Sequence, residues 1–384
     1  MQKITFNDDQ VAAIEMAVEW YRNYRDRVPG TPKFFALGGD AGTGKTTVAR
    51  HIAGLCCAPT RVKYIAPTGK AASRLRDKGC VGAGTVHKFL YHYLGNDFDD
   101  APEFQVKEAL DEQPLLIVCD EASMIGTRMG NDIVSKGIPV LFLGDLGQVD
   151  PVNDDAFLSA DDFSYNLEKI ERNGGNIVRA AFFVRTGGRL PPREYEDVKV
   201  YTRRYTMSDV ERHLDKDSVM LCSYNNTRQL LNMKARIALG LEGSKMPVLG
   251  EKLVCTFNQH TYSISNGEQF ILKDIRDLQE SGRSDTDDEF MKMVTLESIT
   301  NQEVKLAKLH LGCFIGADED ERRSCMRAMG GFDFGYALTI HKSQGSEWIN
   351  VMVIEESMRS TPYAKLQYTA ITRAIKHLTY FRVD

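Results

Sequence analysis

The stretch Gly39–Thr46 constrains the fold of this chain more than any other. It fits the pattern G-x-x-x-x-G-K-[ST], and the apolar run Lys33–Leu37 before it predicts a buried strand. A helix is predicted from about Lys45 through Ala53. The glycines let the loop fold back, so that backbone N–H groups and the positive helix end face one cavity. This order predicts an α/β domain that binds a nucleoside triphosphate; an ordinary glycine-rich turn is the alternative.

The loop residues have separate expected roles. Lys45 is predicted to reach the β- and γ-phosphates and Thr46 to hold Mg²⁺, so ATP and Mg²⁺ are the expected cofactors. The remaining residues predicted to line the bound nucleotide at this loop are Gly42, Thr43, Gly44 and Thr47.

Leu115–Cys119 is an apolar run that ends in two adjacent acids. At the end of a strand, Asp120 is placed to hold the Mg²⁺ shell and Glu121 to polarise an attacking water. The alternative is a helix N-terminus stabilised by its dipole. The phosphate loop on the same predicted sheet favours the catalytic interpretation.

Apolar runs alternate with helical stretches through the first half, which predicts a mostly parallel sheet covered on both faces. The expected strands are Phe34–Leu37, Val62–Ala66, Leu115–Cys119 and Val140–Leu143. A second α/β block begins near Val219 and resumes at Tyr336. Short alternating runs between them, over 250–331, predict a β-rich insert.

Composition leaves the substrate open. The net charge of −5 argues against a protein that coats nucleic acid, although a local basic groove remains compatible with it. The eight cysteines form no C-x-x-C pair, so neither a disulfide framework nor a zinc site is indicated.

No apolar run approaches the length of a membrane span, and no signal-peptide core is recognised, so we expect no membrane partner. The expected location is the cytoplasm, or the host cytoplasm if the chain is phage-encoded.

Val140–Val152 continues from a strand into Gly-Asp-Leu-Gly-Gln-Val-Asp-Pro, and here the chain resembles superfamily 1 helicases, whose third motif reads G-D-x-x-Q-x-x-P. Gln148 takes the position that contacts the γ-phosphate. The resemblance extends, in order and spacing, to further motifs at Phe6–Gln10, Ala66–Ala72, Gly84–His87, Tyr336–Glu347 and Tyr368–Ala374. The most similar subgroup is the RecD/Dda type of superfamily 1B.

The resemblance implies further nucleotide contacts. Gln10 is expected to recognise adenine and Glu347 to contact the nucleotide, while Arg373 is the expected arginine finger. Arg172 resembles a second phosphate-sensing arginine, with a solvated helix arginine as the alternative. The expected catalytic residues are Lys45, Glu121, Gln148, Arg172 and Arg373.

Nucleic-acid contacts are likewise implied. The expected residues are Thr68, Lys70, Thr85, His87, Phe98, Asn258, Thr339, His341 and Lys342. The insert at 90–113 occupies the place of a strand-separating pin, where Phe98 or Phe104 would stack on a base pair or, alternatively, form the insert's own small core. Asn258 belongs to a loop of the β-rich insert.

The expected fold class is α/β, with two RecA-like P-loop NTPase domains. We expect the first at 1–89 and 114–175 with its insert at 90–113, and the second at 176–249 and 332–384 with an SH3-like β-rich insert at 250–331. The implied activity is an ATP-dependent DNA helicase that moves 5′ to 3′ on single-stranded DNA and unwinds a duplex fork. It would act as a monomer, with replication or recombination proteins as partners. The alternatives are an RNA helicase, a protein-displacing translocase, and a kinase or other non-motor NTPase.

Overall fold

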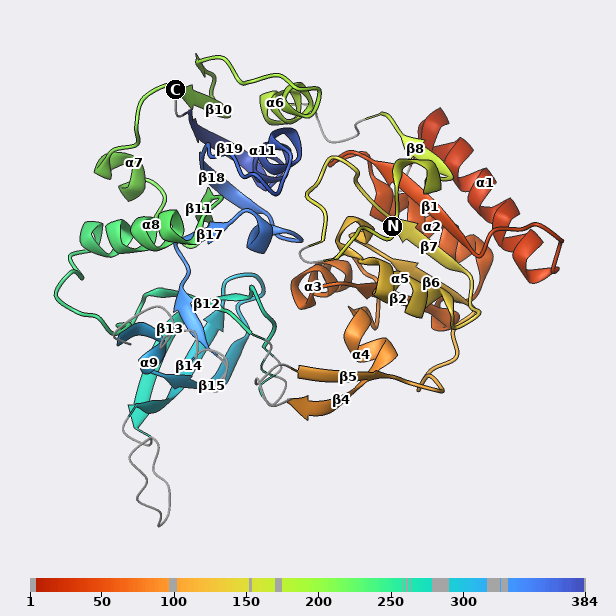
Figure 1. Cartoon of the computed structure of the whole chain (residues 1–384), viewed down its shortest axis with the longest axis horizontal. Coiled ribbons are helices and arrows are strands. Elements are labelled where there is room, and N and C mark those ends of the chain that lie inside the picture. The colour runs from red at the N-terminus through yellow and green to blue at the C-terminus, as the bar shows by residue number, and fades with distance from the viewer. Residues whose placement is uncertain are drawn as a thin grey trace, which may run out of the picture. The chain divides into compact units, whose positions relative to one another are not determined.

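The computed structural model describes residues 5–96, 102–151, 154–169, 175–257, 259, 262, 264–277, 290–315, 325 and 331–382. The chain divides into two compact units (Figure 1). The first comprises Met1–Gly95 and Pro102–Arg179, and the second is built mainly from Ala180–Asp384.

The first unit contains a six-stranded sheet in the order β3-β2-β6-β7-β1-β8, and every neighbouring pair is parallel. Its strands are β1 (Phe34–Gly39), β2 (Val62–Ala66), β3 (Gly84–Thr85), β6 (Leu116–Cys119), β7 (Val140–Leu143) and β8 (Tyr165–Leu167). All four residues of β6 and of β7 are buried, as expected for central strands covered on both faces.

Helices cover the two faces of this sheet. They are α1 (Asp8–Arg25), α2 (Lys45–Cys56), α3 (Gly69–Asp77), α4 (Val86–Leu90) and α5 (Thr127–Val134). Alternate residues of β6 enter different cores: Leu116 and Val118 pack with α1 and α2, whereas Ile117 and Cys119 pack with α4 and α5. The strand alternation thereby places the nucleotide-loop helix on one defined face.

A two-stranded hairpin of β4 (Tyr91–Asn96) and β5 (Pro102–Val106) forms the insert of the first unit. The ring of Phe104 lies 5.0 Å from that of His87 and 5.8 Å from that of Tyr93, measured between centroids. Phe104 therefore belongs to a small aromatic core of the hairpin, which is the alternative considered for it above. Phe98 lies outside the described residues.

The second unit has a six-stranded sheet in the order β17-β11-β18-β19-β10-β9. All its pairs are parallel except that of β9 with β10. The strands are β9 (Arg193–Glu194), β10 (Val198–Tyr201), β11 (Ser218–Cys222), β17 (Ala337–Thr339), β18 (Trp348–Ile354) and β19 (Ala374–Phe381). The helices are α7 (Met207–Glu211), α8 (Asn225–Ala238) and α11 (Tyr363–Ile371), and the boundary between the two units lies within α6 (Asn176–Arg185).

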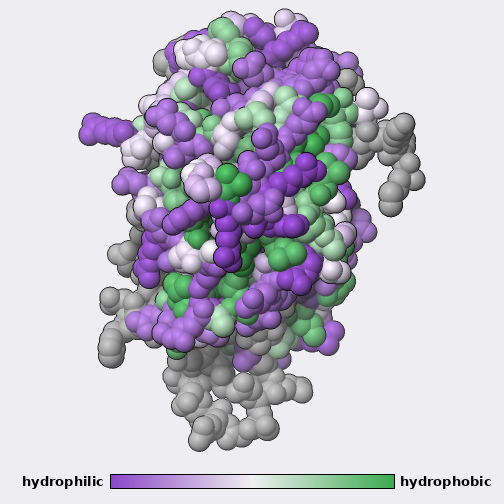
Figure 2. Space-filling view, turned by 90° about the vertical axis from the view of Figure 1, so that its right-hand side faces the viewer, coloured by the Kyte–Doolittle hydropathy of each residue, from purple (hydrophilic) through white to green (hydrophobic). Residues whose placement is uncertain are grey.

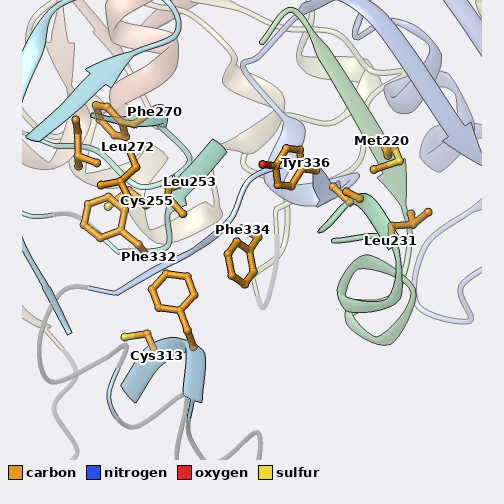
Figure 3. Packing of buried hydrophobic residues seen from close by; sticks show 14 of the residues in the cluster. Met220, Leu231, Leu253, Cys255, Phe270, Leu272, Cys313, Phe332, Phe334 and Tyr336 are labelled. Atoms are coloured by element: carbon orange, nitrogen blue, oxygen red, sulfur yellow. The ribbon is translucent and has the colours of Figure 1, made fainter. Parts of the chain in front are cut away.

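A five-stranded antiparallel sheet, in the order β15-β14-β13-β12-β16, also belongs to the second unit. Its elements are β12 (Lys252–Cys255), β13 (Gln269–Asp277), β14 (Met291–Ser298), β15 (Val304–His310), α9 (Gly312–Ile315) and β16 (Phe332–Phe334). Its buried side chains and those of the neighbouring parallel sheet form one cluster. Figure 3 shows Phe334 and Tyr336 between Leu253 on one side and Met220 and Leu231 on the other.

Among the described residues, no helix has the length and apolar character needed to cross a bilayer. The face of the protein in Figure 2 is dominated by hydrophilic residues, with hydrophobic residues in small separated groups. The strands predicted at Phe34–Leu37, Val62–Ala66, Leu115–Cys119 and Val140–Leu143 are all present within a residue or two. The domain boundaries given above remain a prediction.

Candidate nucleotide site

The phosphate loop connects the end of β1 to the start of α2. Gly42 and Gly44 have φ angles of 89° and 84°, a left-handed conformation that only glycine adopts readily. Gly44 is the N-cap of α2, and no side chain caps this helix. The first-turn N–H groups of α2 therefore remain available to an anion.

Gln10 supports this loop from α1. It is buried, its Nε2 donates to the carbonyl oxygen of Thr43 (3.1 Å), and its Oε1 accepts from the backbone N–H of Asn7 (3.3 Å). A Cβ added at Gly44 would lie 2.8 Å from Gln10 Nε2 and would displace this amide, and the φ of 84° separately favours glycine here. The residue expected to recognise adenine thus lies directly beside the phosphate loop.

Lys45 points back into the loop. Its Nζ donates to the carbonyl oxygens of Gly39 (2.6 Å) and Asp40 (2.9 Å). An ammonium carries three hydrogens, so Lys45 can donate one more hydrogen bond beside these two carbonyls. Its contact with the β- and γ-phosphates stays a prediction.

Thr46 and Asp120 meet at the carboxyl ends of β1 and β6. Thr46 Oγ1 lies 3.3 Å from Asp120 Oδ2. Burial raises the pKa of Asp120, and the charge of Glu121 raises it further, while Lys78 and Lys45 act in the opposite direction. A hydroxyl and a carboxylate are the oxygen ligands that Mg²⁺ prefers, and a cation would relieve the buried negative charge. The side chains present fit Mg²⁺.

Glu121 follows directly and has an unusual backbone. Its φ and ψ of 55° and 43° are left-handed, which is uncommon for a residue with a side chain. Its N–H donates to Asp120 Oδ1 (2.9 Å), and its Oε1 lies 3.9 Å from Nη1 of Arg74 on α3. Lys78, which caps the end of α3, lies with its Nζ 3.4 Å from Thr46 Oγ1.

Neither Arg74 nor Lys78 was among the site residues expected from the sequence. The available signal was their spacing, since Lys70, Arg74 and Lys78 follow one another at intervals of four residues along α3.

Gln148 lies beyond β7, which pairs with both β1 and β6. Its side chain is 5% exposed, and its Nε2 lies 3.4 Å from Asp145 Oδ2. Its buried Oε1 has no hydrogen-bond partner within the described residues. A buried amide oxygen in this state indicates a missing ligand or water. The role of Gln148 near a γ-phosphate stays a prediction.

Arg373 lies in the second unit, at the end of α11, and is only 3% exposed. Its guanidinium donates to the carbonyl oxygens of Thr369 (3.0 Å) and Ser346 (3.2 Å) and to Thr372 Oγ1 (3.1 Å). Glu347 lies just before β18 and is half-buried. Arg172 lies outside the described residues.

Two of the residues expected to contact nucleic acid are helix N-caps. Thr68 Oγ1 accepts from the N–H of Ala71 at the start of α3, and Thr85 Oγ1 accepts from the N–H of Lys88 in α4, both at 3.2 Å. An accepting hydroxyl retains its own hydrogen for donation, so both can still bind a phosphate oxygen. His87 lies in the first turn of α4.

Three more such residues lie in the second unit, at the end of β17 and directly after it. Thr339 Oγ1 accepts from the N–H of Lys342 (3.4 Å), and Lys342 is exposed. His341 is half-buried, and this burial lowers the pKa of its imidazole, which favours the uncharged form. Asn258 lies outside the described residues.

Two family models match parts of the chain. Residues 22–187 match the model of an AAA domain, and residues 334–379 match that of a UvrD-like helicase C-terminal domain. The ATP-dependent RecD2 DNA helicase of Deinococcus radiodurans is 28% identical over 388 residues, which cover 89% of this chain and 46% of the relative. The conjugal transfer protein TraA of Agrobacterium fabrum is 25% identical over 404 residues, which cover 96% of this chain and 32% of the relative. The chain spans less than half the length of these curated relatives.

Solved structures extend the likeness over nearly the whole chain. The Pif1 helicase from Bacteroides in complex with ADP-AlF3 and ssDNA has a TM-score of 0.57 at 14% identity, covering 98% of this chain and 92% of that chain. The Pif1 helicase from Candida albicans has a TM-score of 0.56 at 16% identity, and the match covers 100% of this chain and 95% of that chain. At these identities the likeness shows the fold, and it confirms the predicted α/β class with two RecA-like domains.

Proposed function

We propose that the chain, which resembles the RecD type of superfamily 1B helicases, hydrolyses ATP to move 5′ to 3′ along single-stranded DNA and to separate duplex strands. The movement would be carried by the two motor domains delimited above, acting as a monomer.

One observation supports the ATPase part most directly. Around an uncapped α2 N-terminus the chain gathers an ammonium, a hydroxyl–carboxylate pair and a buried amide oxygen without a partner among the described residues. In this proposal, Lys45 binds the β- and γ-phosphates, Thr46 and Asp120 hold Mg²⁺, and Gln148 positions the γ-phosphate. The metal, when bound, neutralises charge that develops on the transferred phosphoryl group. Glu121 accepts a proton from the attacking water and so activates it.

The second unit would supply Arg373. The proposal requires this side chain to exchange its bonds to Thr369, Ser346 and Thr372 for the γ-phosphate. ATP would then favour one arrangement of the two motor domains and hydrolysis another. A strand gripped unequally in the two states would advance with each cycle.

DNA is the proposed substrate because the RecD2 relative is a DNA helicase and a Pif1 neighbour is complexed with ssDNA. Thr68, Thr85 and Thr339 would contact backbone phosphates, which carry no sequence information. Polarity follows from the resemblance to the RecD/Dda subgroup. An RNA helicase and a protein-displacing translocase remain the alternatives.

The test measures ATP hydrolysis by the chain alone, with oligo-dT and with oligo-rU. We expect strong stimulation by oligo-dT and none in the Lys45→Ala variant, which loses the phosphate-binding ammonium. Stimulation by oligo-rU alone would favour an RNA substrate, and a rate indifferent to both polymers would refute a motor function. Unwinding is then compared on duplexes with a 5′ or a 3′ single-stranded tail, and separation of only the 3′-tailed duplex would reverse the proposed polarity.

A further inference from the structure

Helix α3 connects two parts of the first unit. Thr68 and Lys70, at its N-terminal end, are residues proposed to contact the strand. Its later cations lie against the nucleotide site, where Arg74 faces Glu121 and Lys78 faces Thr46. Residues four apart lie on the same side of a helix, so one row of positive charge runs from the proposed strand contact to Glu121 and Thr46.

The Arg74–Glu121 pair is a charge contact and not a hydrogen bond, since its atoms are 3.9 Å apart. The side chains are 24% and 17% exposed, so water screens their attraction less than it would on the open surface. Such a contact is strong enough to bias the position of Glu121 and weak enough to be exchanged.

The backbone of Glu121 is strained, with φ at 55°. A left-handed conformation at a residue with a side chain persists only where neighbouring groups stabilise it. When those contacts are lost, the strain favours a change to another backbone conformation. The strain and the arginine contact are independent observations at the same residue.

We propose that Arg74 is a positioning residue that restrains Glu121 until nucleic acid binds, and that a phosphate of the bound strand then draws Arg74 away. The inference rests on the proposed function. Arg74 lies one helical turn from Lys70, within the reach of a strand at the N-terminal end of α3. The strand competes with Glu121 for the same guanidinium, and the released carboxylate orients water for hydrolysis. Binding of the strand and release of Glu121 are thus coupled reciprocally.

The test compares ATP hydrolysis by the wild type and by Arg74→Gln, with and without oligo-dT. We expect the DNA-free kcat to rise at least about fivefold, the lower end of typical allosteric couplings, while the KM for ATP stays unchanged. The salt dependence of oligo-dT affinity should fall by about one phosphate contact, a change that a purely structural role would not cause. Arg76→Gln removes the same charge from the exposed side of α3 and should alter neither quantity.

The outcomes separate the two hypotheses. A wild type that oligo-dT does not stimulate refutes the proposed function. A stimulated wild type with an unchanged DNA-free rate in Arg74→Gln overturns the restraint, and so does a variant that is slower in both states. If Arg74→Gln melts early, Arg74→Met, which keeps the apolar stem, is measured in its place and must show the same rise.

Discussion

Lys252 on β12 carries a positive charge in the core of the second unit, and it makes folding stability depend on pH. Its side chain is 1% exposed, and its Nζ donates to the carbonyl oxygens of Asp215 (2.6 Å) and Ser218 (2.8 Å). Burial lowers its pKa from 10.5 to about 8, although the carboxylates of Asp215 and Asp217 oppose this. The pKa difference is worth about 3.4 kcal/mol in full.

The direction of the effect follows from proton binding. Between pH 8 and 10.5 the unfolded chain holds a proton on Lys252 that the folded chain lacks, so the free energy of unfolding rises with pH. About 2 kcal/mol of this increase in the free energy of unfolding occurs between pH 7.5 and 9.5. The rise should be absent in Lys252→Met, which removes the titrating group and keeps an unbranched side chain.

Urea unfolding measures this effect in a Trp20→Phe background, where Trp348 is the remaining tryptophan and reports on the second unit. Tyrosines and cysteines also titrate near pH 9.5, so the comparison is between the pH dependences of this background with and without the Lys252→Met substitution. Lys199→Met, on an exposed position of β10, is the matched control and should keep the wild-type dependence. Equal pH dependences with the lysine and without it would refute the reasoning.

Three further predictions concern single side chains. Arg373→Ala should lower kcat at least about 10³-fold while ATP still binds, as measured by turnover and by equilibrium titration; a loss of affinity alone would contradict the finger role. Arg228→Met should cost about 3–5 kcal/mol in urea unfolding, because Arg228 pairs with Asp333 at 2.6 Å and leaves a buried carboxylate behind; a cost near zero would show that this charge is not buried. Phe104→Ala should lower the stability of the first unit by about 2 kcal/mol, because the half-buried ring belongs to the hairpin core, and an unchanged melting temperature would exclude that packing.

The sequence predicted the strands of the first sheet well, because their positions combine continuous apolar runs with following turn residues. Leu116–Cys119 and Val140–Leu143 are buried on both faces, and this burial produces the apolar run. The sequence did not predict β15, Val304–His310, where lysines interrupt the apolar residues and only part of the strand is buried. An edge strand with one face exposed to solvent has fewer apolar residues, so its hydrophobic pattern is weaker.

The residues of the candidate site likewise differ in whether the sequence alone could predict them. Lys45 and Thr46 could be predicted from sequence because they belong to the loop motif itself, and Asp120 could be predicted because it follows an apolar run that forms a strand of the same parallel sheet. Arg74 could not, because its contact with Glu121 depends on how α3 packs on β2 and β3, and an arginine on a helix usually points to solvent. The burial that leaves Oε1 of Gln148 without a partner among the described residues is likewise encoded by no local pattern.

The core shared by the two sheets of the second unit has a consequence for how this region can vary. Only Gly335 and Tyr336 separate β16 from β17, and Phe334 and Tyr336 pack in the common cluster. The β-rich insert therefore cannot be removed without loss of the shared core, because its deletion would expose Met220 and Leu231 to water. Changes on one side of that core must be matched on the other, so the two sheets are expected to melt together and to diverge together over evolution.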